Sequence, residues 1–158
     1  MKKVFSLLVL IVLVFALSGC GSKLNDIKAE DIFNQEGKYY VYFYKDGCSD
    51  CEDASAVVEE YMEQLKEDKN KDKRKIYAVN LSDSENSLIY RQYKGENGQG
   101  DEGNFFVNEV TEWNKLYIGE TSALIVVGTN KEKEKFATFK ASGSDDITTV
   151  LGEELSDD

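Results

Sequence analysis

An apolar run leads directly into two cysteines in the sequence Tyr39-Tyr40-Val41-Tyr42-Phe43-Tyr44-Lys45-Asp46-Gly47-Cys48-Ser49-Asp50-Cys51. Residues 39–44 have high β-propensity without alternation of polar and apolar positions, which is typical of a central strand covered on both faces. Asp46 and Gly47 then predict a turn. Helical spacing predicts an amphipathic helix next, its apolar face made by Cys51, Ala54, Val57, Val58, Tyr61, Met62 and Leu65.

Helices and strands alternate along the rest of the chain, which favours an α/β domain whose sheet contains parallel strands. Two of the helices carry N-terminal signals, a capping box at 82–85 and a cap at Ser144. The expected elements are a helix from Asn25 or Asp26 to about Asn34, a strand at 39–44, a helix from the cysteines to about 66–69, a strand at 76–81, a helix from 82 to about Tyr93, strands at 123–127 and 135–140, and a helix from Ser144.

A glycine-rich break interrupts this alternation. Residues 98–103 formally match the dinucleotide-binding pattern G-x-G-x-x-G. The match follows an expected helix rather than a strand, and its acidic residues would repel a pyrophosphate, so we reject a dinucleotide site. We predict instead an insertion around 95–113, in which Gly95 to Asn104 is a flexible surface segment. The residues from Phe105 on are too apolar to be loop throughout, and they are left unassigned.

The first 19 residues have the pattern of a secretory signal peptide. Lys2 and Lys3 precede an apolar run from Val4 to Leu17, and the small residues Ser18 and Gly19 follow. The run is short for a membrane-spanning helix, which needs about 20 residues. An uncleaved anchor helix and a core helix are the alternatives, and the second is disfavoured because that helix would be apolar on every face.

The sequence Leu17-Ser18-Gly19-Cys20 resembles the lipobox of bacterial lipoproteins. The resemblance implies cleavage before Cys20 and acylation of its thiol, for example with palmitate. It divides the chain into a lipoprotein signal peptide at 1–19, a lipidated tether at 20–25 and a domain at 26–158. The protein would then be anchored to the outer face of a bacterial cell membrane. An ordinary signal peptide is the alternative, and it would leave an odd thiol in an exported protein.

Composition excludes several classes of function. The chain has 158 residues and a formal net charge of −11, so its surface should repel nucleic acid and anionic headgroups. It contains no histidine, which removes Ser-His-Asp, Cys-His and histidine-zinc chemistry. We expect neither a metal nor a cofactor.

The spacing of Cys48 and Cys51 favours redox chemistry. Cys48 lies at the helix start, where unpaired N–H groups and the helix dipole stabilise a thiolate. Cys51 is in register with Ala54 and Val58, so it should point inward. An exposed nucleophile with a shielded partner suits thiol–disulfide exchange. The alternatives are a structural disulfide, whose short loop restrains the unfolded chain little, a metal site, which lacks two further ligands, and a redox-inert binding fold.

The order of the expected elements resembles that of the thioredoxin family over about Leu24 to Leu155. In this order a strand is followed by C-x-x-C, a helix and then β-α-β-β-α. The resemblance implies a thioredoxin-like fold, a mixed central sheet flanked by helices. It also implies that Cys48 is the attacking thiolate, that Cys51 resolves the mixed disulfide, and that a substrate groove is formed by Gly47, Ser49, Asp50, Thr121 and Ser122.

The chain departs from that family at four places. Gly47 replaces a frequent tryptophan, and Ser49-Asp50 replaces Gly-Pro between the cysteines. Tyr42 stands where the family has a buried acid, and Ser122 where it has a cis-proline. A cis bond before a residue other than proline costs about 2.5–4 kcal/mol, so we expect a trans bond at Ser122.

Acidic residues crowd the cysteines, at Asp46, Asp50, Glu52 and Asp53. Nearby negative charge raises a thiol pKa, so we expect a reductant or exchange partner rather than a strong oxidase. The sequence thus predicts a thiol–disulfide oxidoreductase acting on exported proteins, with a membrane electron donor if it reduces them. The second hypothesis is a redox-inert accessory lipoprotein that binds a partner beside an export system.

Overall fold

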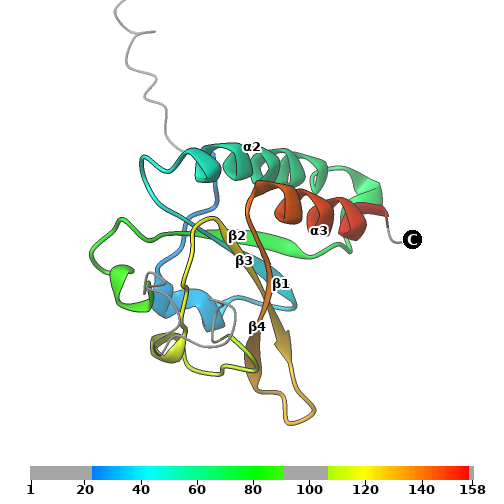
Figure 1. Ribbon diagram of the computed structural model, residues 1–158. Coiled ribbons are helices and arrows are strands. Elements are labelled where there is room, and N and C mark those ends of the chain that lie inside the picture. The colour runs from blue at the N-terminus through cyan, green and yellow to red at the C-terminus, as the bar shows by residue number, and fades with distance from the viewer. Residues whose placement is uncertain (1–22, 91–106, 157–158) are drawn as a thin grey trace, which may run out of the picture.

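The computed structural model describes residues 23–90 and 107–156, and its centre is a four-stranded mixed sheet (Figure 1). The strand order is β2-β1-β3-β4. β1 runs parallel to β2 and antiparallel to β3, and β4 is antiparallel to β3. This topology confirms the predicted α/β, thioredoxin-like fold. The strands are β1 (Tyr39–Tyr44), β2 (Lys75–Asn80), β3 (Ala123–Thr129) and β4 (Lys135–Ser142).

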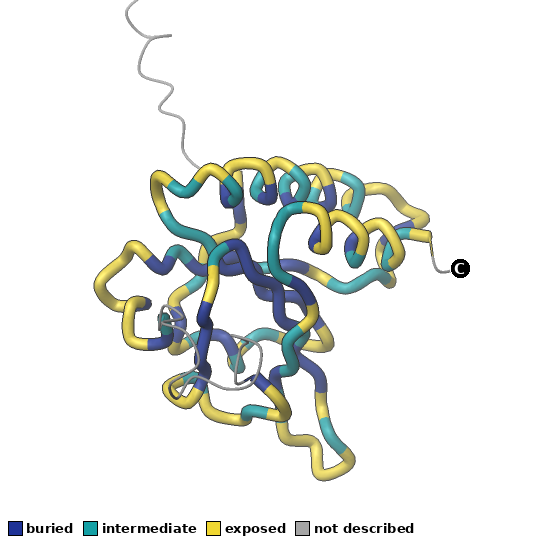
Figure 2. The backbone as a smooth tube through the Cα atoms, viewed as in Figure 1, coloured by how far each residue is buried: buried dark blue, intermediate teal, exposed yellow. Residues whose placement is uncertain are grey.

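β1 is central and covered on both faces, as its unbroken apolar sequence predicts. Tyr39, Val41 and Phe43 belong to one hydrophobic cluster, and Tyr40 and Tyr42 belong to the other. All five are buried, and the strands form the dark centre of the chain trace (Figure 2). The strand therefore shows no polar alternation because each of its faces lies against a separate apolar layer.

Two α-helices lie side by side over one face of the sheet (Figure 1). They are α2 (Ser49–Gln64) and α3 (Ser144–Ser156). α2 buries Cys51, Ala54, Val58 and Tyr61 on the side predicted from the helical spacing. The strand–turn–helix segment that carries both cysteines is thereby fixed to the core at each end.

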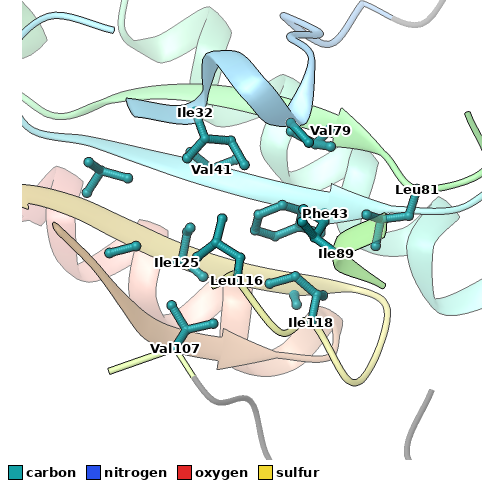
Figure 3. Close-up of a cluster of buried hydrophobic side chains, with 14 of the residues drawn as sticks. Ile32, Val41, Phe43, Val79, Leu81, Ile89, Val107, Leu116, Ile118 and Ile125 are labelled. Atoms are coloured by element: carbon teal, nitrogen blue, oxygen red, sulfur yellow. The ribbon is translucent and has the colours of Figure 1, made fainter. Parts of the chain in front are cut away.

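Short 3-10 helices and irregular chain cover the opposite face. Ile32, Ile89 and Leu116 pack there around Val41 and Phe43 of β1 (Figure 3). The 3-10 helices on this side are η1 (Ala29–Asn34), η3 (Ser87–Ile89) and η5 (Trp113–Lys115), and a further one, η2 (Asp68–Asn70), connects α2 to β2.

The predicted N-terminal helix is wrong at its start and in its type. Asn25 and Ile27 pair with the outer edge of β2, where the Ile27 N–H donates to Ala78 O at 2.8 Å and the Ala78 N–H donates to Asn25 O at 2.9 Å. These backbone bonds hold residues 25–27 extended, so Asn25 and Asp26 do not cap a helix. The helical turns begin only at Ala29 and are 3-10.

The predicted α-helix from 82 is also wrong over the residues that the structure describes. Turns follow β2, and only Ser87–Ile89 is helical, as η3. The side chain of buried Asn86 bonds elsewhere: its Oδ1 accepts from the Ala29 N–H at 2.8 Å and its Nδ2 donates to Asn80 O at 2.9 Å. Hydrogen bonds from Asn86 to two other segments thus take the place of the regular backbone hydrogen bonds of an α-helix.

The predicted insertion around 95–113 lies partly outside the described residues, at 95–106. Its described part, from Val107 on, packs against the core, in agreement with the apolar residues found there. Val107 is buried, and Val110 pairs with Ala137 of β4 through two backbone hydrogen bonds of 3.1 and 2.8 Å.

The predicted signal peptide and Cys20 lie outside the described residues. Within 23–90 and 107–156, none of the helices has the length and apolarity needed to span a bilayer.

Candidate active site

The turn between β1 and α2 is anchored to the end of β2. The Asp46 N–H donates to Ser82 Oγ at 2.9 Å, and Asn80 Nδ2 donates to Asp46 Oδ1 at 3.0 Å. Gly47 has φ 68°, a left-handed conformation that glycine adopts without steric cost. This turn delivers the chain to Cys48 at the N-terminus of α2.

Cys48 and Cys51 form a disulfide with their Cα atoms 5.1 Å apart. Cys48 is the N-cap of α2, and its Sγ accepts a hydrogen bond from the Cys51 N–H at 3.2 Å. Cys48 is partly exposed, whereas Cys51 is only 2% exposed. The predicted arrangement of an accessible cysteine at the helix start and a shielded one a turn later is confirmed.

The segment before β3 lies against the disulfide. Thr121 Oγ1 is 3.6 Å from Cys48 Sγ. The Thr121–Ser122 peptide bond is cis, so the expectation of a trans bond is wrong. In this conformation both the N–H and the hydroxyl of Ser122 reach the Asp50 carboxylate. Of the residues predicted to form a substrate groove, Gly47 and Ser49 are exposed, Asp50 and Thr121 are partly exposed, and Ser122 is fully buried.

Asp50 joins three parts of the fold. Its Oδ2 accepts from Ser122 Oγ at 2.7 Å and from the Ser122 N–H at 3.4 Å, and its Oδ1 accepts from the Ser144 N–H at 3.4 Å. The hydrogen bond from the Ser122 hydroxyl holds the pKa of the Asp50 carboxyl below its usual value, against the opposing effect of partial burial. The sequence places Asp50 among acids near the thiols but does not reveal these partners.

Tyr42 stands at the position for which the thioredoxin resemblance implied a buried acid. It is fully buried, its hydroxyl donates to Cys51 O at 3.0 Å, and it lies 3.2 Å from Ser55 Oγ. Burial raises the pKa of Tyr42 to about 12, so the phenol is neutral at physiological pH. Tyr42 therefore braces the first turn of α2 and does not supply a carboxylate to the site.

An open pocket of about 550 Å³ lies beside Cys51. Its wall includes Cys51 and three acidic residues of the turn and of α2, together with Lys45. Asp46 and Glu52 of the predicted acidic cluster line this pocket, whereas Asp53 is exposed on α2 and does not. The lining residues are Leu24, Tyr44, Lys45, Asp46, Gly47, Cys51, Glu52, Ser55, Ala56 and Glu59.

The side chains described do not gather as a metal site. Across 23–90 and 107–156, no group of three or more cysteine, aspartate or glutamate side chains is arranged to hold a metal ion.

Protein-family models and curated proteins give no match to the chain. Solved structures that resemble it include the J-Trx1 fragment of ERdj5 and chloroplastic thioredoxin z. The J-Trx1 fragment of ERdj5 is 15% identical with a TM-score of 0.37, over 77% of this chain and 44% of that one, so this chain spans less than half of the fragment. Chloroplastic thioredoxin z is 13% identical with a TM-score of 0.43, over 85% of this chain and 96% of that one. Both are thioredoxin-family proteins to which this chain is similar in its α/β fold.

Proposed function

We propose that the protein exchanges thiols and disulfides with other proteins through Cys48 and Cys51. One observation carries the proposal. A disulfide lies at the N-terminus of α2, with Cys48 accessible and hydrogen-bonded to the backbone and Cys51 almost fully buried. Backbone N–H groups at a helix start favour a thiolate, and the difference in access decides which sulfur a partner meets.

The exchange is balanced within the two proteins. In the reduced protein the Cys48 thiolate attacks one sulfur of a target disulfide, forming a mixed disulfide and releasing one target thiolate, which takes up a proton. Cys51 loses its proton and attacks Cys48 Sγ, so the second target thiolate leaves. Two electrons pass from the dithiol to the target, and the reverse sequence oxidises a target dithiol.

An equilibrium titration in glutathione or dithiothreitol buffers tests this proposal. We expect a reversible two-electron Cys48–Cys51 couple, read by alkylation and peptide mass spectrometry of the purified protein. Its midpoint will show whether the protein reduces or oxidises its targets. A pair that never forms a disulfide, or never releases one in strong reductant, would contradict exchange and favour the redox-inert binding function.

We further propose that Cys20 is acylated and holds the domain on the outer face of a bacterial membrane, where exported proteins are the targets. The lipobox-like Leu17-Ser18-Gly19-Cys20 supports this location. Cytosolic reductants do not reach that face, so a reducing role needs a membrane dithiol as electron donor.

The Cys20→Ser substitution tests the anchor. We expect it to abolish both labelling by a palmitate analogue and the cleavage that precedes Cys20. The Cys48–Cys51 midpoint should stay unchanged, because the substituted residue is outside the redox pair. Membrane retention of the unsubstituted protein without labelling would instead indicate an uncleaved anchor helix.

A further inference from the structure

We propose that Asp50 is a positioning residue that fixes the Thr121–Ser122 segment and so keeps the Thr121 hydroxyl against the sulfur of Cys48. The inference rests on the proposed exchange function, because it concerns the reactivity of the attacking thiol. It assigns to Asp50 a role that differs from that of a nearby negative charge. Three sets of contacts carry it.

The first contact set joins Asp50 to Ser122. Asp50 Oδ2 accepts hydrogen bonds from the hydroxyl and from the N–H of Ser122, at 2.7 and 3.4 Å. Ser122 has no exposed surface, so water cannot readily replace these acceptors. A buried hydroxyl without a partner is costly, and the bond to Asp50 therefore constrains where Ser122 lies.

The second contact set fixes the same segment from α3. Asp50 Oδ1 accepts from the Ser144 N–H at 3.4 Å, and the Gly143 N–H donates to Ser122 O at 3.0 Å. One carboxylate in the first turn of α2 thus connects the segment before β3 with the start of α3. Ser122 is held from both sides, and Thr121 precedes it directly.

The third contact reaches the reacting atom. Thr121 Oγ1 lies 3.6 Å from Cys48 Sγ in the disulfide. After reduction, a hydroxyl at this position can donate to the Cys48 thiolate. Hydrogen bonding to the charged form lowers a thiol pKa, so the segment held by Asp50 promotes ionisation of Cys48.

The two roles that Asp50 could play have opposite signs. A carboxylate acting only as a neighbouring charge raises the pKa of the Cys48 thiol, so its removal would lower that pKa. A carboxylate that positions Thr121 lowers the thiol pKa indirectly, so its removal would raise it. The sign of the change in one variant therefore separates the two roles.

The test is the pH profile of Cys48 alkylation by iodoacetamide in the reduced, purified protein, read by peptide mass spectrometry. We expect Asp50→Ala, Ser122→Ala and Thr121→Val each to raise the Cys48 pKa, slowing alkylation near pH 7 about three- to tenfold. The double variant Asp50→Ala/Ser122→Ala should be no slower than either single one, because both act on one contact. Asp53→Ala, which removes an exposed charge from the same helix, should not raise the pKa.

A fall in the Cys48 pKa in Asp50→Ala, or an unchanged pKa in Ser122→Ala, would overturn the proposal. Asp50→Asn keeps an acceptor oxygen for Ser122 without the charge, and it should not slow alkylation. This variant keeps the proposal testable if Asp50→Ala unfolds. The profile needs no exchange partner, so its failure is distinct from that of the exchange function, which the equilibrium titration reports.

Discussion

Cys51→Ser is expected to accumulate mixed disulfides with target proteins, whereas Cys48→Ser is expected to lose exchange completely. Cys48 is the partly exposed sulfur at the start of α2, so it can still attack when its partner is a hydroxyl. Without Cys51, no second thiolate releases the target. A serine hydroxyl at position 48 stays protonated at neutral pH, and Cys51 is 2% exposed, so neither atom can replace the Cys48 thiolate.

Non-reducing electrophoresis after acid quenching and alkylation measures both variants. Adducts should appear in Cys51→Ser, disappear with dithiothreitol, and be absent from Cys48→Ser and from the double variant. Unfolding midpoints in reductant serve as the control for intact structure. Equal adduct formation by both single variants would contradict the assignment of Cys48 as the attacking thiol, and partner binding that survives Cys48→Ser would favour the binding function.

Glu154→Ala is expected to reduce the free energy of unfolding by about 2–4 kcal/mol. The Glu154 side chain is 10% exposed and pairs with Arg74. It also accepts from the Tyr40 hydroxyl at 3.0 Å and from the Arg74 N–H at 3.1 Å. Removal of the carboxylate leaves three donors without their acceptor where α3 meets β1 and the start of β2. Because the Arg74 side chain is 38% exposed, water can recover part of the loss.

Urea unfolding with a common m-value measures this effect. Glu153→Ala is the matched control, since Glu153 is the exposed neighbour on the same helix turn, and it should change stability by less than about 0.5 kcal/mol. The Cys48–Cys51 midpoint should be the same in both variants, because Glu154 lies at the opposite end of α3 from Ser144. A Glu154→Ala protein as stable as Glu153→Ala would show that the ion pair contributes nothing net.

Local patterns predicted the elements that hold the cysteines. The strand at 39–44 and the helix after Cys51 each bury apolar side chains against a hydrophobic cluster. The buried positions therefore appear as an apolar pattern within a short stretch of sequence. The capping box at 82–85 wrongly predicted an α-helix, because the side chain of Asn86 accepts from the N–H of Ala29, 57 residues away in the chain. A local signal was there overridden by a tertiary hydrogen bond.

The candidate site shows the same limit. The positions of Cys48 and Cys51 followed from one strand–turn–helix segment. The partners of Asp50 did not, since Ser122 is 72 residues and Ser144 is 94 residues away in the chain. An acid that the sequence groups with its charged neighbours is thus turned by the fold toward hydroxyl and backbone donors. Spacing alone gives no signal for such a contact.

In a protein acylated at Cys20, the position of Leu24 would limit the distance between the redox site and the membrane. Leu24 lines the same pocket as Gly47 and Cys51, and it is four residues after Cys20. Four fully extended residues span at most about 14 Å. With an acyl chain on Cys20, this short tether would keep the dithiol close to the lipid headgroups. Such a protein would select its targets by the height of their cysteines above the bilayer as much as by the sequence around them.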